Sequence, residues 1–140
     1  MTPEDINVVQ ESFQKVAAIA DQAAEIFYRH LFALDPQLKR LFPSDMHTQG
    51  RKLMQMIGLA VHGLNSPGTL IPAVQALGRR HVAYGVEAKD YETVGKALIL
   101  TLEQGLGADF TPPVQEAWLA TYQLLAKTMK QAAYANPQAA

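Results

Sequence analysis

The chain contains no cysteine among its 140 residues. That absence excludes disulfides, thiolate-bound iron–sulfur clusters, cysteine-rich zinc sites and a cysteine nucleophile. A chain without disulfides suits a reducing compartment, so we expect a cytoplasmic protein. The chain also lacks an excess of one charge, because its formal net charge is −1. No stretch approaches the roughly 18 consecutive apolar residues of a membrane span. Neither nucleic acid nor a membrane is therefore an expected partner.

The first residues, Met1 to Asp5, lack the basic region and apolar core of a secretory signal peptide. The length is typical of one domain, and 49% of the residues are hydrophobic, which is enough for a buried core. We expect one domain over residues 1–134, followed by a disordered tail over residues 135–140. Nothing in the sequence indicates an oligomeric state.

Apolar residues recur at helical spacing throughout, and no segment alternates in the manner of a strand. Proline, glycine and capping residues divide this pattern into six to eight helices. Thr2 and Pro3 open the first helix, Asp35-Pro36 opens a short one, and Thr69 is the expected cap of the helix that carries His81. A second helix is expected through Ala23, Phe27, Leu31 and Leu34, and others near residues 46–64 and 90–106, with a loop at 43–45. A long final helix is expected to open at Thr111-Pro112 and to extend through Met129. Such unequal helices favour an all-α array crossing at steep angles over an up-down bundle.

His81 is the candidate for chemistry among four histidines, the others being His30, His47 and His62. It follows Val74 and Leu77 on one helical face, so its imidazole projects from an apolar stripe. A buried imidazole needs a partner, and a metal ion is one, because neutral imidazole nitrogen is a good iron ligand. No other histidine lies three or four positions away, which excludes a two-histidine zinc helix. Paired carboxylates and glycine-rich phosphate loops also lack a recognisable pattern.

Four segments together resemble the globin family, closest to single-domain bacterial haemoglobins and the neuroglobin-like branch. The resemblance extends from about Asp5 to Met129. The segments are Phe27-Tyr28-Arg29-His30-Leu31-Phe32 with Asp35-Pro36 and Leu41-Phe42; Arg51-Lys52-Leu53-Met54; Leu77-Gly78-Arg79-Arg80-His81 with Tyr84-Gly85-Val86; and Tyr91-Glu92-Thr93-Val94-Gly95 with Ala117-Trp118 and Tyr122. The resemblance implies a globin fold, with helices packed three-on-three around one non-covalent haem b.

Carried over by position, the resemblance implies that His81 binds the haem iron and that Phe42 stacks on the porphyrin. It places Tyr28 and Gln49 as polar residues on the distal side, where gas binds, with Leu53 as the apolar wall. The remaining residues implied to contact haem are Lys52, Leu77, Arg80, Tyr84, Val86, Tyr91 and Val94. Among them Lys52, Arg80 and Tyr84 are expected at the edge of the haem, where cations meet propionates.

The resemblance implies reversible binding of dioxygen, and of gases such as NO or CO, at a five-coordinate ferrous haem. Hydrogen bonds from Tyr28 and Gln49 are expected to raise oxygen affinity. Gln49 stands where neuroglobins have a distal histidine, and an amide binds iron poorly. Two alternatives stay open. One is NO dioxygenase activity with a separate reductase, and the other is a globin-fold module for sensing or interaction, with or without haem.

The proximal side, which carries the iron ligand, departs from the flavohaemoglobin pattern at one position. In flavohaemoglobin globin domains, a tyrosine and a glutamate support the iron-binding histidine. Tyr91 matches that tyrosine, whereas Ala133 stands where the glutamate is expected. The resemblance therefore leaves enzymatic turnover undecided.

Overall fold

The computed structural model describes residues 1–42 and 45–134, and this part of the chain is helical without strands. Two positions of the expected loop, 43 and 44, and the expected tail over residues 135–140 lie outside the described residues. The helices are α1 (Pro3–Ala17), α2 (Ala20–Leu34), the 3₁₀ helix η1 (Pro36–Leu41), α3 (Met46–Gly63), α4 (Pro67–Tyr84), α5 (Asp90–Leu106), the 3₁₀ helix η2 (Gly107–Asp109) and α6 (Pro112–Tyr134). The all-α prediction and its count of six to eight helices are confirmed.

Helix boundaries follow local capping chemistry. The Thr2 side chain accepts a hydrogen bond from the Asp5 backbone N–H while the Asp5 carboxylate accepts one from the Thr2 N–H, which completes a capping box. Asp35 caps η1 by accepting from the Gln37 N–H. Thr69 does not cap α4, contrary to the prediction. The helix already begins at Pro67, because proline is pre-organised for the first helical position and needs no hydrogen-bond partner there.

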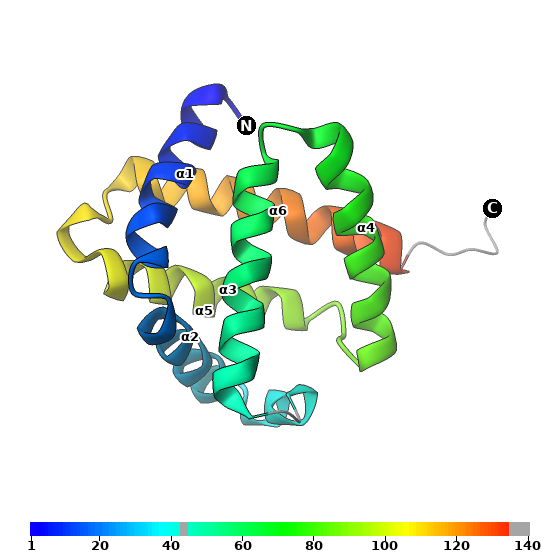
Figure 1. Ribbon diagram of the computed structural model, residues 1–140. Helices are drawn as coiled ribbons and strands as arrows, with labels where there is room; N and C mark the ends of the chain where they lie inside the picture. The colour runs from blue at the N-terminus through cyan, green and yellow to red at the C-terminus, as the bar shows by residue number, and fades with distance from the viewer. Residues whose placement is uncertain (43–44, 135–140) are drawn as a thin grey trace.

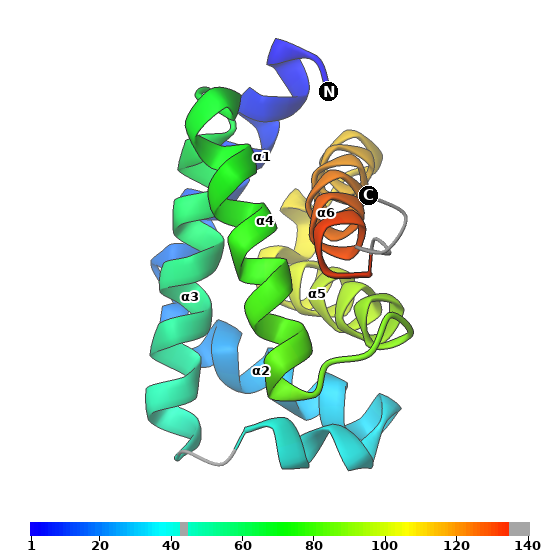
Figure 2. The ribbon, with the colours of Figure 1, turned by 90° about the vertical axis from the view of Figure 1, so that its right-hand side faces the viewer.

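The α-helices cross in two layers. Figure 2 shows α3 and α4 side by side in one layer, and α5 and α6 in a second layer next to it. Figure 1 shows the helices of the two layers crossing. With α1 beside α3 and α2 beside α5, this is a three-on-three arrangement. The most extensive helix contacts join α4 to α6 and α2 to α5. His81 therefore lies on a helix that packs extensively against α6 where the two cross (Figure 1).

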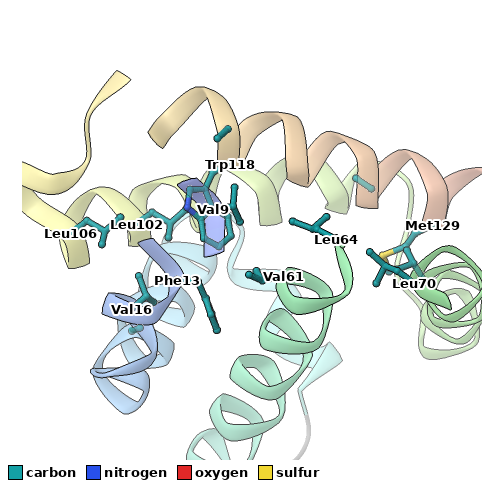
Figure 3. Close-up of a cluster of buried hydrophobic side chains, with 14 of the residues drawn as sticks. Val9, Phe13, Val16, Val61, Leu64, Leu70, Leu102, Leu106, Trp118 and Met129 are labelled. Atoms are coloured by element: carbon teal, nitrogen blue, oxygen red, sulfur yellow. The ribbon is translucent and has the colours of Figure 1, made fainter. Parts of the chain in front are cut away.

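The core centres on Trp118, which is 2% exposed and packs at a ring-centroid distance of 6.4 Å from Phe13 (Figure 3). Its indole N–H donates to the Ser12 hydroxyl at 2.8 Å, so the buried polar group is satisfied. Ser12 in turn donates to the Val8 carbonyl. This chain of hydrogen bonds fixes α1 against α6.

Gly78 sets the distance between α4 and α6. A Cβ atom at this position would lie 2.5 Å from the Met129 carbonyl oxygen and 2.7 Å from its Cα. Because no side chain fits, the two backbones approach more closely than any larger residue would allow. The close contact at Gly78 therefore fixes the distance of α4, the helix that carries His81, from α6.

None of the helices in the described residues is long and apolar enough to span a membrane.

Candidate functional site

His81 lies in the last turn of α4 and is half-buried. Its Nδ1 atom is 2.9 Å from the carbonyl oxygen of Leu77, one turn earlier. A carbonyl oxygen only accepts hydrogen bonds, so Nδ1 carries the hydrogen in this contact and Nε2 keeps its lone pair. Burial lowers the pKa of His81 below its usual value, and the neighbouring Arg80 charge acts in the same direction, against the hydrogen bond to Leu77. His81 is thus a neutral imidazole with one nitrogen available to a metal.

The other three histidines lack this arrangement. His47 and His62 are exposed, and the His62 ring lies edge-on to Phe13 with ring centroids 6.4 Å apart. His30 is within hydrogen-bond distance of the Gln104 side chain, at 3.1 Å. His81 differs from them because it is half-buried and its Nδ1 donates a hydrogen bond to the Leu77 carbonyl.

Tyr28 stands at the centre of a group of aromatic rings on α2 and directly after η1. Phe42 lies edge-on to it with centroids 5.1 Å apart, Phe32 is stacked at 5.8 Å, and Phe27 is edge-on at 5.2 Å. Leu53 from α3 and Val94 from α5 are partly buried against the same cluster. The structure therefore brings together four of the residues named from sequence: Tyr28, Phe42, Leu53 and Val94.

The Tyr28 hydroxyl donates to the backbone carbonyl of Gln49 at 3.3 Å, which joins α2 to the first turn of α3. Gln49 itself is half-buried. Burial raises the pKa of Tyr28 to about 12, so the hydroxyl keeps its hydrogen at neutral pH. The contact is long for an O–H···O bond, whose usual length is about 2.7–2.8 Å. A stronger acceptor can therefore compete with the Gln49 carbonyl for this donor.

Leu77, Val86 and Tyr91 lie on the α4–α5 side and pack against the main core rather than against the Tyr28 cluster. Tyr91 is 5% exposed, and its hydroxyl is buried with no hydrogen-bond partner among residues 1–42 and 45–134. Burial raises the pKa of Tyr91 to about 12, with smaller contributions from Tyr134 and Asp90. The backbone carbonyl of Tyr91 accepts from the Tyr122 hydroxyl at 2.6 Å. An unpaired buried hydroxyl marks a position where a further polar partner is expected.

Lys52 and Arg80 are exposed, and Tyr84 is 64% exposed, so these three lie at the surface rather than inside either cluster. The Tyr84 ring stays close to His81, with centroids 6.1 Å apart. Arg80 and Lys52 are exposed next to the half-buried His81 and Leu53 in the chain, so we take the three side chains as the rim of the candidate site. A rim position is consistent with the expected edge contacts.

Three aromatic residues of the site region were assigned no role from the sequence. Phe27 and Phe32 both pack against Tyr28. The helical spacing of Phe32, four residues after Tyr28, was an available signal, whereas Phe27 is its neighbour in the chain and gives no such signal. Tyr134, at the end of α6, donates to the Val86 carbonyl at 2.6 Å and so ties α6 to the turn after α4. The sequence carries no signal for this last contact, because 48 residues separate the partners.

A family model described as Globin matches residues 25–129. The chain belongs to the globin family. This globin is 28% identical over 130 residues to a flavohemoprotein of Vibrio cholerae, an alignment that covers 91% of the chain and 33% of that protein. It is 31% identical over 107 residues to a flavohemoprotein of Chromobacterium violaceum, covering 74% of the chain and 26% of that protein. The chain thus spans about a third of the length of the curated relatives it matches.

A solved structure, that of a hexacoordinated heme protein from an anhydrobiotic tardigrade, superposes on this globin with a TM-score of 0.87 and 16% sequence identity. The superposition covers 96% of each chain and confirms the globin fold. The cofactor of the family is haem b, and the residues present fit it. His81 offers a neutral nitrogen donor, half-buried apolar side chains lie on α3, α4 and α5, and exposed cations stand at the rim.

Proposed function

We propose that this globin binds dioxygen reversibly at a five-coordinate ferrous haem b. Within this proposal His81 is the axial ligand, Phe42, Leu53, Leu77, Val86, Tyr91 and Val94 contact the porphyrin, and Lys52, Arg80 and Tyr84 lie at its edge. Haem b supplies an iron with one coordination position left for a diatomic gas. The observation that carries the proposal is the 2.9 Å contact between His81 Nδ1 and the Leu77 carbonyl, which leaves Nε2 free for a metal.

Tyr28 and Gln49 are the proposed ligand-binding residues. A dioxygen ligand would carry more partial negative charge than carbon monoxide, so hydrogen-bond donors beside it would favour dioxygen. The Tyr28 hydroxyl is a protonated donor held by aromatic neighbours, and a side-chain amide at Gln49 is a second donor. Two such bonds, at roughly 1–1.5 kcal/mol each, slow dissociation about 30- to 150-fold. Tight oxygen binding and slow release follow.

Absorption spectra of the purified protein test this proposal directly. We expect a Soret band, a five-coordinate ferrous form, and distinct spectra with dioxygen and with carbon monoxide. A six-coordinate ferrous spectrum would contradict the assignment of Gln49. A colourless protein that takes up no added haem would favour the alternative of a haemless interaction module.

NO dioxygenase activity with a separate reductase is the second candidate. The resemblance to flavohemoproteins, which this globin matches over about a third of their length, favours it. The residues give weaker support, because the half-buried Ala133 stands where flavohaemoglobins have a glutamate. Nitrate yield with a reductase supplied separately tests this activity, and yield no higher than that of free haem would exclude it.

A further inference from the structure

The net charge of −1 conceals a strong separation of charge along the chain. Residues 36–86, which form η1, α3 and α4, contain six lysines and arginines and a single acid, Asp45. The rest of the chain contains six basic and twelve acidic residues. The central third of the sequence is therefore strongly basic, while the remainder is acidic.

The fold gathers these cations at one end of the molecule. They stand as pairs on η1, in the first half of α3 and in the second half of α4, and these three segments lie together at the bottom of Figures 1 and 2. The Arg40 guanidinium lies 3.8 Å from the point where a Cβ on Gly85 would stand, so η1 meets the end of α4. We call this group the basic rim; its members are Lys39, Arg40, Arg51, Lys52, Arg79 and Arg80.

All six side chains of the basic rim are exposed. The ion pairs found in the described part of the chain join Lys15 to Asp109, Arg29 to Glu25 and Lys89 to Glu87, and none involves the rim. Lys39 is held by the Phe32 ring, with its Nζ 5.7 Å from the ring centroid. Lys52 and Arg80 are the cations expected to meet haem propionates, and the other rim charges, which none of these ion pairs neutralises, contribute a field directed outward.

Three members of the basic rim adjoin residues of the candidate haem site in the chain. Arg80 precedes His81 in the chain, Lys52 precedes Leu53, and Arg40 is two residues from Phe42. A protein that docks on the rim is therefore brought to the opening of the site. From this placement we propose that the basic rim is the docking surface for an electron-donor protein with an acidic surface.

The choice of an acidic protein rests on charge complementarity together with the place of the rim. Complementary fields speed association and orient the partner, and their effect weakens as salt rises. The proposal rests on the proposed haem function, because the docked partner reduces the iron of the bound haem. One electron leaves the donor, and ferric iron becomes ferrous with no atom transferred. Ferrous iron is the state that binds dioxygen, so a chain of this kind needs such a supply.

Binding of a purified flavodoxin, a small acidic electron-transfer protein, tests the proposal on the haem-loaded globin. The variant Arg40→Glu/Arg79→Glu reverses two rim charges that contact neither His81 nor the Tyr28 cluster in the contacts described above. Lys96→Glu/Lys127→Glu is the matched control: it changes the net charge by the same amount at exposed positions on α5 and α6. The dissociation constant and the rate of ferric haem reduction by reduced flavodoxin are measured for each at low and physiological salt.

We expect the rim variant to weaken binding and slow reduction by at least about tenfold at low salt, with the difference shrinking as salt screens the charges. The control is expected to change either quantity less than about threefold. Reduction by dithionite, a small anion, reports whether the haem itself remains accessible. Equal losses in both variants, or no salt dependence in the native protein, would overturn the proposal.

A 20-nucleotide DNA duplex of the same concentration is the competing ligand. If it binds the rim more tightly than flavodoxin does at matched salt, the rim is a general polyanion surface and the proposal is wrong. A protein that takes up haem and binds dioxygen but whose rim variant binds flavodoxin as the native protein does would refute the docking proposal alone, whereas a protein that takes up no haem would refute the proposed function. The two failures are therefore distinguishable.

Discussion

Two hydrogen bonds to backbone carbonyls prepare the side chains on which the candidate site depends. His81 donates from Nδ1 to Leu77, which fixes the ring and frees Nε2, and Tyr28 donates to Gln49 over a longer distance of 3.3 Å. The first contact is short and lies within one helix, whereas the second crosses between two helices. The imidazole is therefore held in place, while the phenol can change partners when a polar ligand enters.

Removing the Tyr28 hydroxyl tests the distal donor. Tyr28→Phe keeps the ring and its aromatic neighbours but deletes the donor, so we expect dioxygen to dissociate about 5- to 12-fold faster, as one bond of roughly 1–1.5 kcal/mol is lost. Carbon monoxide dissociation should change much less, which makes it the internal control. Stopped-flow ligand replacement measures both rates. An unchanged oxygen rate would show that Tyr28 does not contact the ligand.

The oxygen rate should also stay nearly constant between pH 7 and pH 10. Burial raises the pKa of Tyr28 to about 12, so the phenol keeps its hydrogen throughout this range. A tyrosine with an ordinary pKa near 10 would be about half ionised at pH 10 and would lose its donor. Dissociation measured across the range in the native protein and in Tyr28→Phe checks this point. A rise toward the Tyr28→Phe rate by pH 10 would contradict the burial of the hydroxyl.

At single positions, the sequence offers a signal where one side chain carries it and offers none where a distant partner decides. Phe42 and Tyr28 were predicted to be site residues, and they lie edge-on to each other in one cluster. The unpaired Tyr91 hydroxyl and the contact of Tyr134 with Val86 were not predicted, because each depends on how α4, α5 and α6 meet. For every site residue, the contact with haem stays a prediction.

At the scale of helices, boundaries could be predicted because prolines and caps are local. The helix expected near residues 90–106 occurs with those bounds, and the one expected near residues 46–64 spans Met46–Gly63. The start of α4 was predicted wrongly at Thr69. The helix begins at Pro67, because the fixed φ of proline suits the first helical position. Which helix faces which is not local. The contact of α4 with α6 depends on a glycine that sequence periodicity treats as a neutral residue.

Gly78→Ala tests how closely α4 must approach α6. The added methyl group would meet Met129 backbone atoms that cannot rotate away, so α4 must shift. We expect the free energy of unfolding to fall by about 1–3 kcal/mol, as is typical of overpacking, and haem to dissociate faster because His81 moves with α4. Urea denaturation and haem transfer to apomyoglobin measure the two effects.

Gly68→Ala is the matched control, since a Cβ at Gly68, near the start of the same helix, would meet nothing within 4 Å. It should leave stability unchanged or raise it by up to about 1 kcal/mol, as expected for alanine in a helix. Similar losses in both variants would show that the close contact at Gly78 is not the cause.

At the scale of the whole molecule, the fold divides its apolar side chains into two clusters, and the candidate site involves both. Tyr28, Phe42, Leu53 and Val94 belong to one, while Leu77, Val86 and Tyr91 pack against the other. A group bound between residues of the two clusters links them. Because such a group binds the folded chain and not the unfolded one, it stabilises the fold.

Haem should therefore raise the resistance of the whole chain to denaturant. With haem at a thousandfold excess over its dissociation constant, the expected gain is about 4 kcal/mol. Comparing urea transitions of the haem-free and haem-loaded protein, followed by helical circular dichroism, measures it. Coincident transitions would mean that haem does not bridge the two clusters.

The axial bond of His81 is the central claim, and replacement of its ring by free imidazole tests it most directly. In His81→Gly the axial ligand is removed, and imidazole added to solution can occupy the vacated space. We predict that ferrous His81→Gly loses the native absorption spectrum and recovers it when imidazole is added, while His47→Gly keeps the native spectrum throughout. A His81→Gly protein whose spectrum matches the native one without imidazole would contradict the account.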